Sequence, residues 1–300
     1  MKILIQIPCL NEQDQLAQII DDIRANVSAF DYELLIIDDG STDNTVKVAK
    51  ELKVDHVISF KRNMGLGYAF QEGLDFAKKK GYDYLINTDA DNQYQSKYIN
   101  DLYHSILNSK SDIVIGARNH DKIKHFSFLK KCFQKIGSTV VRLISGVKIT
   151  DAVSGFRIYS KEAINTLFVT SKFSYTLDTI LQAQDKNLQI TEIPIEVNPP
   201  IRKSRLFKGM FQFISRQLTV IIKCFIIYKP FEFFATVSLL PFVLGIVPII
   251  RFLINYFIND GGGNIQSLIL GSMSILLAFI LIALGIVGFL IKDLRKRNLS

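Results

Sequence analysis

The sequence contains no tryptophan and only three cysteines among its 300 residues. Cys9, Cys132 and Cys224 lie far apart and are odd in number, which fits neither a disulfide framework nor a zinc site. A reducing, cytoplasmic location for the main domain is the simplest interpretation. The first ten residues are one short apolar run followed at once by polar residues, so we expect no signal peptide.

Acidic residues are also scarce, because 28 Asp and Glu face 36 Lys and Arg, giving a formal charge of +8. The excess positive charge is localised. From Arg202 to Lys229 there are seven basic residues and no acidic one, and Lys292–Arg297 holds four basic residues and one Asp. A basic protein can bind nucleic acid, but basic residues beside apolar segments favour a membrane surface. We expect membrane lipid and no nucleic acid as a partner.

The chain is too apolar for an ordinary soluble domain, with 48% hydrophobic residues and a mean hydropathy of +0.21. Two segments carry most of the surplus. Phe233–Ile250 and Ile265–Ile291 contain no charged residue, and each is long enough to cross a bilayer. The sequence therefore predicts two transmembrane helices, at about 231–257 and 265–291, that form a hairpin.

The flanking charges predict the orientation of this hairpin. Basic residues precede the first span and follow the second, which places both termini and the main domain on the cytoplasmic side. Arg251, near the outer end of the first span, is expected to snorkel. Residues 206–227 combine a basic stripe with a broad apolar face, which predicts an interfacial helix, with a buried core helix as the alternative. The predicted organisation is 1–200 catalytic domain, 201–230 amphipathic juxtamembrane helices, 231–291 spans and 292–300 basic tail.

Residues 1–200 alternate between strand-like apolar runs and helical patterns. The predicted strands are Lys2–Ile7, which Pro8 ends, then Tyr32–Ile37, His56–Phe60, Tyr82–Ile86, Asp112–Gly116 and Leu188–Val197. This alternation predicts an α/β domain with a mostly parallel, Rossmann-like sheet.

Two carboxylates follow the fourth predicted strand. Asp89 and Asp91 are two residues apart, so we expect both to point the same way at the carboxyl end of that strand, where open α/β sheets bind ligands. Oxygen ligands of this kind suit Mg²⁺ or Mn²⁺. The alternative is a polar loop whose Asp residues cap the next helix.

A dinucleotide-binding domain is disfavoured by the position of the glycines. The residues after the first strand, Pro8–Glu12, contain none. Gly65 and Gly67 come after the third strand, and Phe70 stands where the fingerprint requires a third glycine.

Five motifs stand together in the order of one known family: Ile7-Pro8-Cys9-Leu10-Asn11-Glu12, Asp38-Asp39-Gly40-Ser41-Thr42-Asp43, Asn63-Met64-Gly65-Leu66-Gly67, Asp89-Ala90-Asp91-Asn92-Gln93 and Ser154-Gly155-Phe156-Arg157. With them the chain resembles the inverting glycosyltransferases of family 2, which have the GT-A fold. Within that family it is similar to the dolichyl- and polyprenyl-phosphate sugar (mannose or glucose) synthases with C-terminal membrane helices. The resemblance spans most of the first 160 residues.

The resemblance implies roles for individual residues. The nucleotide base and ribose would contact Pro8, Leu10, Glu12, Ile37 and Asp39. The ribose or diphosphate would contact Asp89 and Ala90, and the metal would be held by Asp91 and Gln93 with Asp89. The acceptor phosphate would meet Arg118, Lys130 and Lys131, and further phosphate contacts would come from Arg157, Arg202 and Arg205. The implied catalytic set is Asp89, Asp91, Arg118 and Arg157.

The sequence departs from the family pattern in two places. Tyr94 and Gln95 stand where the family often has His-Pro-Pro, and the Arg-Gly-Ser-Lys pattern after the last strand is compressed to Arg202–Arg205.

The implied reaction moves one sugar from a UDP- or GDP-linked donor to a polyprenyl (undecaprenyl or dolichyl) phosphate. A divalent metal and arginines would stabilise the departing diphosphate. The acceptor phosphate is already ionised and needs no general base, whereas a sugar hydroxyl does.

Two alternatives remain open. One is a glycosyltransferase that extends a glycan with Asp178 as base. A chain without tryptophan lacks the Gln-x-x-Arg-Trp motif of processive synthases, and two spans are few for a polysaccharide channel. The other is a membrane-anchored scaffold that binds nucleotide sugar without turnover. Association of the spans into a homo-oligomer is a further expectation.

Overall fold

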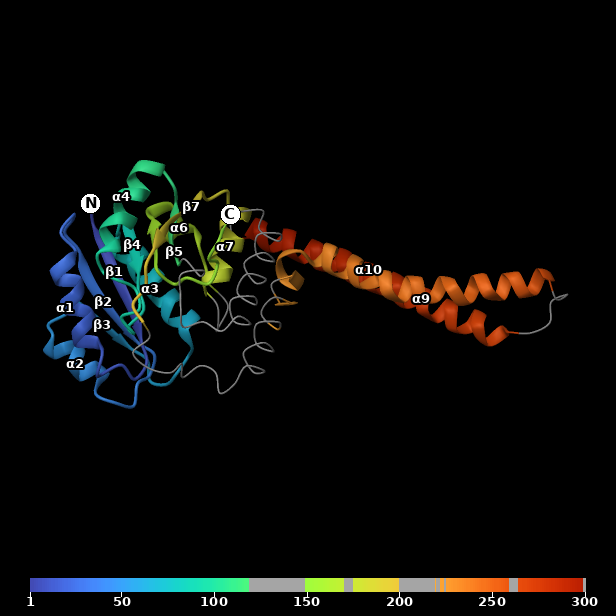
Figure 1. Cartoon of the computed structure of the whole chain (residues 1–300), viewed down its shortest axis with the longest axis horizontal. Coiled ribbons are helices and arrows are strands. Elements are labelled where there is room, and N and C mark those ends of the chain that lie inside the picture. Colours follow the sequence, from blue (N-terminus) through green and yellow to red (C-terminus); the bar gives the residue numbers. More distant parts are fainter. Residues whose placement is uncertain are drawn as a thin grey trace. The chain divides into compact units, whose positions relative to one another are not determined.

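The computed structural model describes residues 1–118, 149–169, 175–199, 219, 222–223, 225–258 and 264–298. The chain divides into two compact units, Met1–Ser215 and Arg216–Ser300. The first unit contains a seven-stranded sheet with helices on both faces, and the second contains two long helices (Figure 1).

The strands of the sheet are β1 Ile3–Cys9, β2 Glu33–Asp38, β3 His56–Ser59, β4 Tyr84–Asn87, β5 Ile113–Arg118, β6 Arg157–Ser160 and β7 Ile190–Ile195. The helices of the same unit are α1 Leu16–Asn26, α2 Thr45–Glu51, α3 Leu66–Lys80, α4 Tyr98–Ser109, α6 Lys161–Thr166 and α7 Tyr175–Asp185.

The strand order is β3-β2-β1-β4-β6-β5-β7. All neighbours pair in parallel except β6, which is antiparallel to both β4 and β5. The predicted mostly parallel sheet is confirmed, whereas β6 was not expected as a strand. Its antiparallel insertion brings the amino end of β6 to the edge where β4 and β5 have their carboxyl ends.

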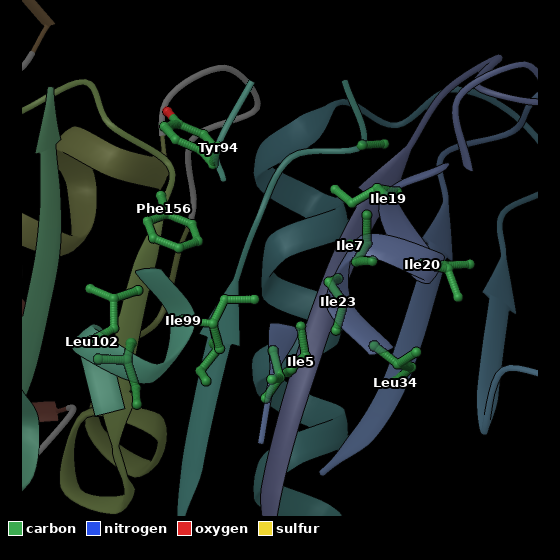
Figure 2. Packing of buried hydrophobic residues seen from close by; sticks show 14 of the residues in the cluster. Ile5, Ile7, Ile19, Ile20, Ile23, Leu34, Tyr94, Ile99, Leu102 and Phe156 are labelled. Atoms are coloured by element: carbon green, nitrogen blue, oxygen red, sulfur yellow. The ribbon is translucent and has the colours of Figure 1, made fainter. Parts of the chain in front are cut away.

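One face of the sheet packs against α1, α2 and α4. Alternate residues of β1 (Ile3, Ile5, Ile7) meet Ile19, Ile20 and Ile23 of α1 in a core that continues through Leu34, Ile99, Leu102 and Phe156 (Figure 2). Period-two alternation in the strands and 3.6-residue spacing in the helices explain why these positions are apolar.

The other face packs against α3, α6 and α7 and carries more polar groups. Gln6 of β1 and Asn87 of β4 lie side by side in the register, and Gln6 Nε2 donates to Asn87 Oδ1 at 2.8 Å. Helix α3 approaches closely because of Gly73, where a Cβ would lie 1.6 Å from Gln6 Oε1.

Pro8 does not end the first strand, contrary to the prediction. Strand β1 runs to Cys9, and Pro8 pairs with Ile37 of β2. On its other side β1 pairs with β4 only from Ile3 to Gln6. At Pro8 the strand thus has a single neighbour, which lowers the cost of the missing backbone donor.

The second unit consists of α9, Pro230–Ile258, and α10, Ile265–Asn298. Both are long and apolar enough to cross a membrane. In the most apolar stretch of 18 residues, only 17% of α9 and 11% of α10 is buried, whereas the core helix of a soluble protein would be mostly buried. The two predicted apolar helices are confirmed. The last helix continues through most of the residues predicted as a basic tail.

Small residues bring the two helices together in antiparallel contact (Figure 1). A Cβ on Gly245 would lie 2.8 Å from the carbonyl oxygen of Gly271, and one on Gly285 would lie 3.1 Å from Phe234 Cβ. Ala278, midway between these glycines, is 1% exposed. Such residues let helix backbones approach within a bilayer, where hydrophobic burial gives no driving force.

Candidate active site

Asp89 and Asp91 lie in a turn beyond β4. The strand ends at Asn87, so the strand alternation used to predict a common direction does not extend to these residues. A tight turn instead brings the carboxylates together. Asn92 has a positive φ of 52°, and the backbone N–H of Gln93 donates to Asp91 Oδ1 at 3.1 Å. The side chain of Asn92 fixes this turn by donating to Asp22 of α1 at 2.8 Å.

The two carboxylates destabilise each other's charge. Burial and the neighbouring Asp91 raise the pKa of Asp89 to about 7, although the cation of Arg118 acts in the opposite direction. Asp89 is also close to the loop that precedes β6, because a Cβ on Gly155 would lie 3.2 Å from its Oδ1. Excess negative charge on oxygen ligands at a sheet edge is what a hard divalent cation would offset.

The oxygen atoms of Asp89, Asp91 and Gln93 are suitable ligands for Mg²⁺ or Mn²⁺ that also binds substrate. Among the residues that the structure describes, no group of three or more His, Cys, Asp or Glu side chains is arranged to hold a metal ion. Asp91, with Asp89 and the amide of Gln93, would therefore supply only part of the coordination. Mg²⁺ commonly takes one or two carboxylates and completes its shell with water and substrate phosphate.

The loops after β1 and β2 brace each other. The backbone N–H of Asn11 donates to Ser41 Oγ and that of Glu12 to Thr45 Oγ1, both at 2.8 Å. In return, Thr42 N donates to Asn11 Oδ1 at 2.8 Å. Asn11 adopts a positive φ of 56°, which asparagine tolerates better than most residues. The polar residues of the second motif therefore hold the first loop in place.

Asp39 directly follows β2, and its side chain binds the glycine-containing turn that follows β3. Its carboxylate accepts the backbone N–H of Met64 at 2.6 Å and that of Gly65 at 2.9 Å. In a phosphate-binding loop such amides would face the ligand. Here they face a protein carboxylate, which agrees with the sequence argument against a dinucleotide fingerprint. Burial raises the pKa of Asp39, and these two amides counteract that rise only in part.

The other residues expected around the nucleotide differ in accessibility. Leu10 is exposed and Glu12 is buried at the loop after β1. Pro8 and Ile37 are buried in the sheet, and Ile37 Cδ1 would lie 2.9 Å from a Cβ on Gly73 of α3. The side chain of Ile37 thus belongs to the core, and the predicted contact between it and a base is not supported by this geometry.

Arg118 ends β5 and forms a two-point ion pair with Asp151. Its Nε lies 2.7 Å from Asp151 Oδ2 and its Nη2 lies 3.0 Å from Oδ1, while its backbone N–H also donates to Oδ2 at 3.2 Å. The two side chains are 11% and 1% exposed. Arg118 is close enough to Asp89 to lower the pKa of that carboxyl. The predicted acceptor-phosphate residue therefore lies at the same edge as the aspartate pair.

Arg157 has a different environment from the one predicted. It is fully buried at the start of β6. Its guanidinium donates at 2.7 to 2.9 Å to four oxygen atoms, the carbonyls of Ser154, Ala152 and Thr176 and the hydroxyl of Thr179. These bonds join β6 to α7 and to the preceding loop. The predicted phosphate contact at Arg157 is not supported, and this geometry favours a structural role.

Asp178 lies in the first turn of α7 and is buried, with 6% exposure. Tyr175, at the start of α7, reaches the end of β4, two residues before Asp89. Tyr175 Oη accepts a hydrogen bond from Asn87 Nδ2 at 2.9 Å and lies 2.5 Å from the Cβ position of Gly155. Sequence reasoning missed this connection, because nothing in the spacing of Asn87 and Tyr175 indicates that they meet.

Tyr94 is also part of the site's supporting structure. Its ring stacks on Phe156 with centroids 5.1 Å apart, and its Oη accepts the backbone N–H of Gly155 at 3.2 Å (Figure 2). Tyr94 thus buttresses the loop that touches Asp89, at a position where the sequence departs from the family pattern. The predicted contacts of Lys130, Lys131, Arg202 and Arg205, and most of the predicted interfacial helix, lie outside the described residues.

A sequence profile described as Glycosyl transferase family 2 matches residues 4–168. Among curated proteins, the chain is 28% identical over 212 residues to UDP-N-acetylglucosamine--dolichyl-phosphate N-acetylglucosaminyltransferase of Methanococcus voltae, covering 63% of this chain and 83% of that protein. It is also 28% identical over 203 residues to polyprenol monophosphomannose synthase of Mycolicibacterium smegmatis, covering 64% of this chain and 76% of the relative.

Among solved structures, the chain resembles glucosyl-3-phosphoglycerate synthase from Mycobacterium tuberculosis in complex with Mn²⁺, UDP and glucosyl-3-phosphoglycerate. The TM-score is 0.59 at 18% identity, over 75% of this chain and 78% of the other. A second structure of the same synthase, with Mg²⁺ and UDP, gives a TM-score of 0.57 at 18% identity, over 75% and 78% of the two chains. At this identity the likeness shows the fold alone, and the predicted GT-A fold is confirmed.

Proposed function

The chain belongs to glycosyl transferase family 2, and we propose that it transfers one sugar from a UDP- or GDP-linked donor to a polyprenyl phosphate, with inversion, at the cytoplasmic face of a membrane. The observation that carries this proposal is the juxtaposition of the Asp89–Asp91 turn with Arg118 at one edge of the sheet. The names of the relatives support a polyprenyl-phosphate acceptor. The two apolar helices support a membrane location.

The aspartate turn and Arg118 carry opposite charges and have different roles in this reaction. Asp91, with Asp89 and Gln93, would hold Mg²⁺ or Mn²⁺, as the metal-bound fold neighbours support. When bound, the ion supplies positive charge that stabilises the leaving diphosphate. Arg118 supplies fixed positive charge that attracts and orients an anionic acceptor. The acceptor oxygen is already ionised, so no side chain has to remove a proton from it.

The loops after β1 and β2 have a separate task. Their mutual hydrogen bonds make a rigid surface that binds the nucleoside of the donor, next to Asp39 and Leu10. Rigid positioning of a donor lowers the entropic part of the barrier, because the reacting groups no longer search for their alignment.

The test is to incubate the purified 300-residue chain in detergent with undecaprenyl phosphate, Mn²⁺ and a panel of labelled nucleotide sugars. We expect one donor to yield a lipid-linked monosaccharide whose anomeric configuration is opposite to that of the donor. The Asp91→Asn substitution should lower the rate at least about 100-fold, the scale seen when a group that stabilises transition-state charge is removed. Asp101→Asn, on the exposed side of α4, is the matched control and should leave the rate unchanged.

Two results would contradict the proposal. If no donor gives a lipid product while free oligosaccharides are extended, the chain is a glycan-extending enzyme. If Asp91→Asn is as active as the unmodified chain, the aspartate turn is not the diphosphate site.

A further inference from the structure

Asp151 is the buried partner of Arg118, and nothing in the sequence motifs assigns it a task. Its carboxylate receives three hydrogen bonds from Arg118, two from the side chain and one from the backbone N–H. At 1% exposure it is almost wholly removed from solvent. A desolvated, two-point pair of this kind fixes the plane of a guanidinium as well as its position.

Asp151 is itself held from behind. Glu192 of β7 accepts the backbone N–H of Thr150 at 2.9 Å, the hydroxyl of Thr150 at 2.8 Å and the backbone N–H of Asp151 at 3.1 Å. Strand β7 pairs with β5, the strand that ends in Arg118. The carboxylate and the arginine that it binds are thus anchored to two neighbouring strands, which makes the pair a fixed part of the sheet edge.

The pair uses only part of the guanidinium. Arg118 has five side-chain N–H donors, and Asp151 takes the Nε hydrogen and one Nη2 hydrogen. The Nη1 donors and the second Nη2 hydrogen are directed away from Asp151 by the planar geometry of the group. Arg118 ends β5, and β6 joins that end to the end of β4, just before Asp89. The remaining donors of Arg118 thus lie at the sheet edge that carries the aspartate turn.

From this geometry we propose that Asp151 is a positioning residue, which holds Arg118 so that its remaining N–H donors bind a phosphate oxyanion of a substrate. The inference rests on the proposed function and deepens it. The oxyanion belongs either to the lipid acceptor or to the diphosphate of the donor, and the two sources give different kinetic results.

The hydrogen bonds to Glu192 favour this positioning role over that of a gate, a residue that would block Arg118 until substrate binds. A gate would have to leave Arg118 when phosphate arrives, and removing its charge would then tighten phosphate binding. A positioning residue stays in place, and removing its charge weakens binding. The Asp151→Asn substitution keeps the side-chain shape but places an NH₂ group against a guanidinium donor, so the arginine is expected to turn away.

The first measurement is the KM of each substrate for the intact chain in detergent. In Asp151→Asn, the KM for undecaprenyl phosphate should rise about tenfold if the oxyanion is the acceptor's, and the KM for the nucleotide sugar should rise instead if it is the donor's. A tenfold change corresponds to about 1.4 kcal/mol. Asp151→Glu should recover part of the loss. Unchanged KM values, or a lower one, would overturn the proposal.

Asp112→Asn is the matched control. Asp112 immediately precedes β5, at the end opposite Arg118, and its carboxylate likewise accepts hydrogen bonds, from Ser160 Oγ at 3.0 Å and Gln189 N at 2.9 Å. Its substitution should change stability without changing either KM. If Asp151→Asn does not fold, Glu192→Gln tests the same anchor more gently, because it only weakens hydrogen bonds, and the expected KM change is about threefold in the same direction.

The second measurement does not need turnover. Phenylglyoxal modifies accessible arginines, and peptide mass spectrometry reads the rate at each one. Arg118 should react faster in Asp151→Asn than in the unmodified chain, while Arg24 should not change. In the unmodified chain, undecaprenyl phosphate or UDP should protect Arg118, and in Asp151→Asn this protection should be lost. If the enzyme assay fails but this protection is seen, the proposed function is wrong and the positioning role stands. Equal reactivity of Arg118 in both forms would overturn the positioning role.

Discussion

Gly40 shows how one residue determines the distance between two loops of the site. It follows Asp39 and has a φ of 75°, and a Cβ there would lie 2.4 Å from the backbone carbon of Arg62. The turn after β2 is therefore pressed against the loop that donates two amides to Asp39. A side chain at this position would both strain the backbone and push the two loops apart.

Gly81 provides a direct comparison for a substitution at Gly40. Gly81 has a similar φ of 71°, but no atom lies within 4 Å of its Cβ position. Gly81→Ala should cost only the left-handed conformation, about 1–2 kcal/mol. Gly40→Ala should cost at least about 2 kcal/mol more, because backbone atoms must move. Thermal unfolding of the two variants measures the difference, and equal melting temperatures would show that the close approach is absent in solution.

Arg157 and Asp151 mark the limit of what single residues reveal in a sequence. The motif around Ser154–Arg157 indicates a functional segment, but it does not tell which of its charged residues faces a ligand. That depends on partners distant in the chain. Arg157 is enclosed by carbonyls and by Thr179, and Asp151 meets Arg118, 33 residues earlier. Asp89 and Asp91 were predictable as a pair, because two carboxylates so close in sequence repel each other and are stabilised by a bound cation.

At the scale of elements, a polar cluster joins the amino ends of the strands, at the end of the sheet opposite the site. Glu33 at the start of β2 accepts a hydrogen bond from Tyr82 Oη at 2.5 Å and lies 2.6 Å from His56 Nε2. Lys2 Nζ is 3.8 Å from its other oxygen. The bonds from Tyr82 and then His56 lower the pKa of Glu33. This cluster joins the beginnings of the first four strands.

The lowered pKa fixes the sign of a pH effect. A carboxylate whose folded pKa is depressed stabilises the fold above its unfolded pKa of about 4.3, and the contribution disappears as the pH falls through the folded value. Because the Glu33 side chain is 36% exposed and solvent screens its charge, Glu33→Gln should cost only about 0.5 kcal/mol near pH 7 and clearly less near pH 3. Unfolding followed at both pH values measures this, with Glu51→Gln, on an exposed helical pair, as the control. A penalty that persists in acid would contradict the account.

The packing of α9 against α10 makes a second prediction at this scale. A Cβ on Gly285 would lie 3.1 Å from Phe234 Cβ, so a small outward movement of the two helices would reach the separation of about 3.5–4.5 Å that a disulfide needs. Cysteines at Phe234 and Gly285, with the three native cysteines replaced by alanine, should join on mild oxidation. A pair at Phe234 and the exposed Ile286 should react at least about tenfold more slowly. Mass spectrometry of the digested protein detects the bond, and equal rates would show that the helices do not pack in this register.

The elements themselves were largely predictable, and the exceptions have physical causes. Buried parallel strands are continuous apolar runs, so β1, β2 and β4 were visible in the sequence. Strand β6 has only four residues and begins with a charged side chain, Arg157, so it lacks that pattern. The predicted end of the fourth strand, Ile86, is one residue from the observed end of β4 at Asn87, but the strand alternation does not continue to Asp89 and Asp91.

At the scale of the whole molecule, a family 2 glycosyltransferase domain and two apolar helices share one chain. The basic residues between and after these parts predict that both ends of the hairpin lie on the cytoplasmic side. In that arrangement the proposed reaction on lipid phosphates would take place at the membrane that the two helices cross. A tethered enzyme meets its lipid acceptor at high local concentration, which favours a lipid substrate over a soluble one.

The central claim is that the turn at Asp89 and Asp91 holds a divalent ion against the diphosphate of the donor. Anomalous diffraction from crystals grown with Mn²⁺ and a nucleoside diphosphate tests it most directly. The account predicts one strong manganese peak beside the Asp91 carboxylate and the diphosphate between that peak and Arg118. A turn without manganese, with the nucleotide bound elsewhere on the chain, would contradict it.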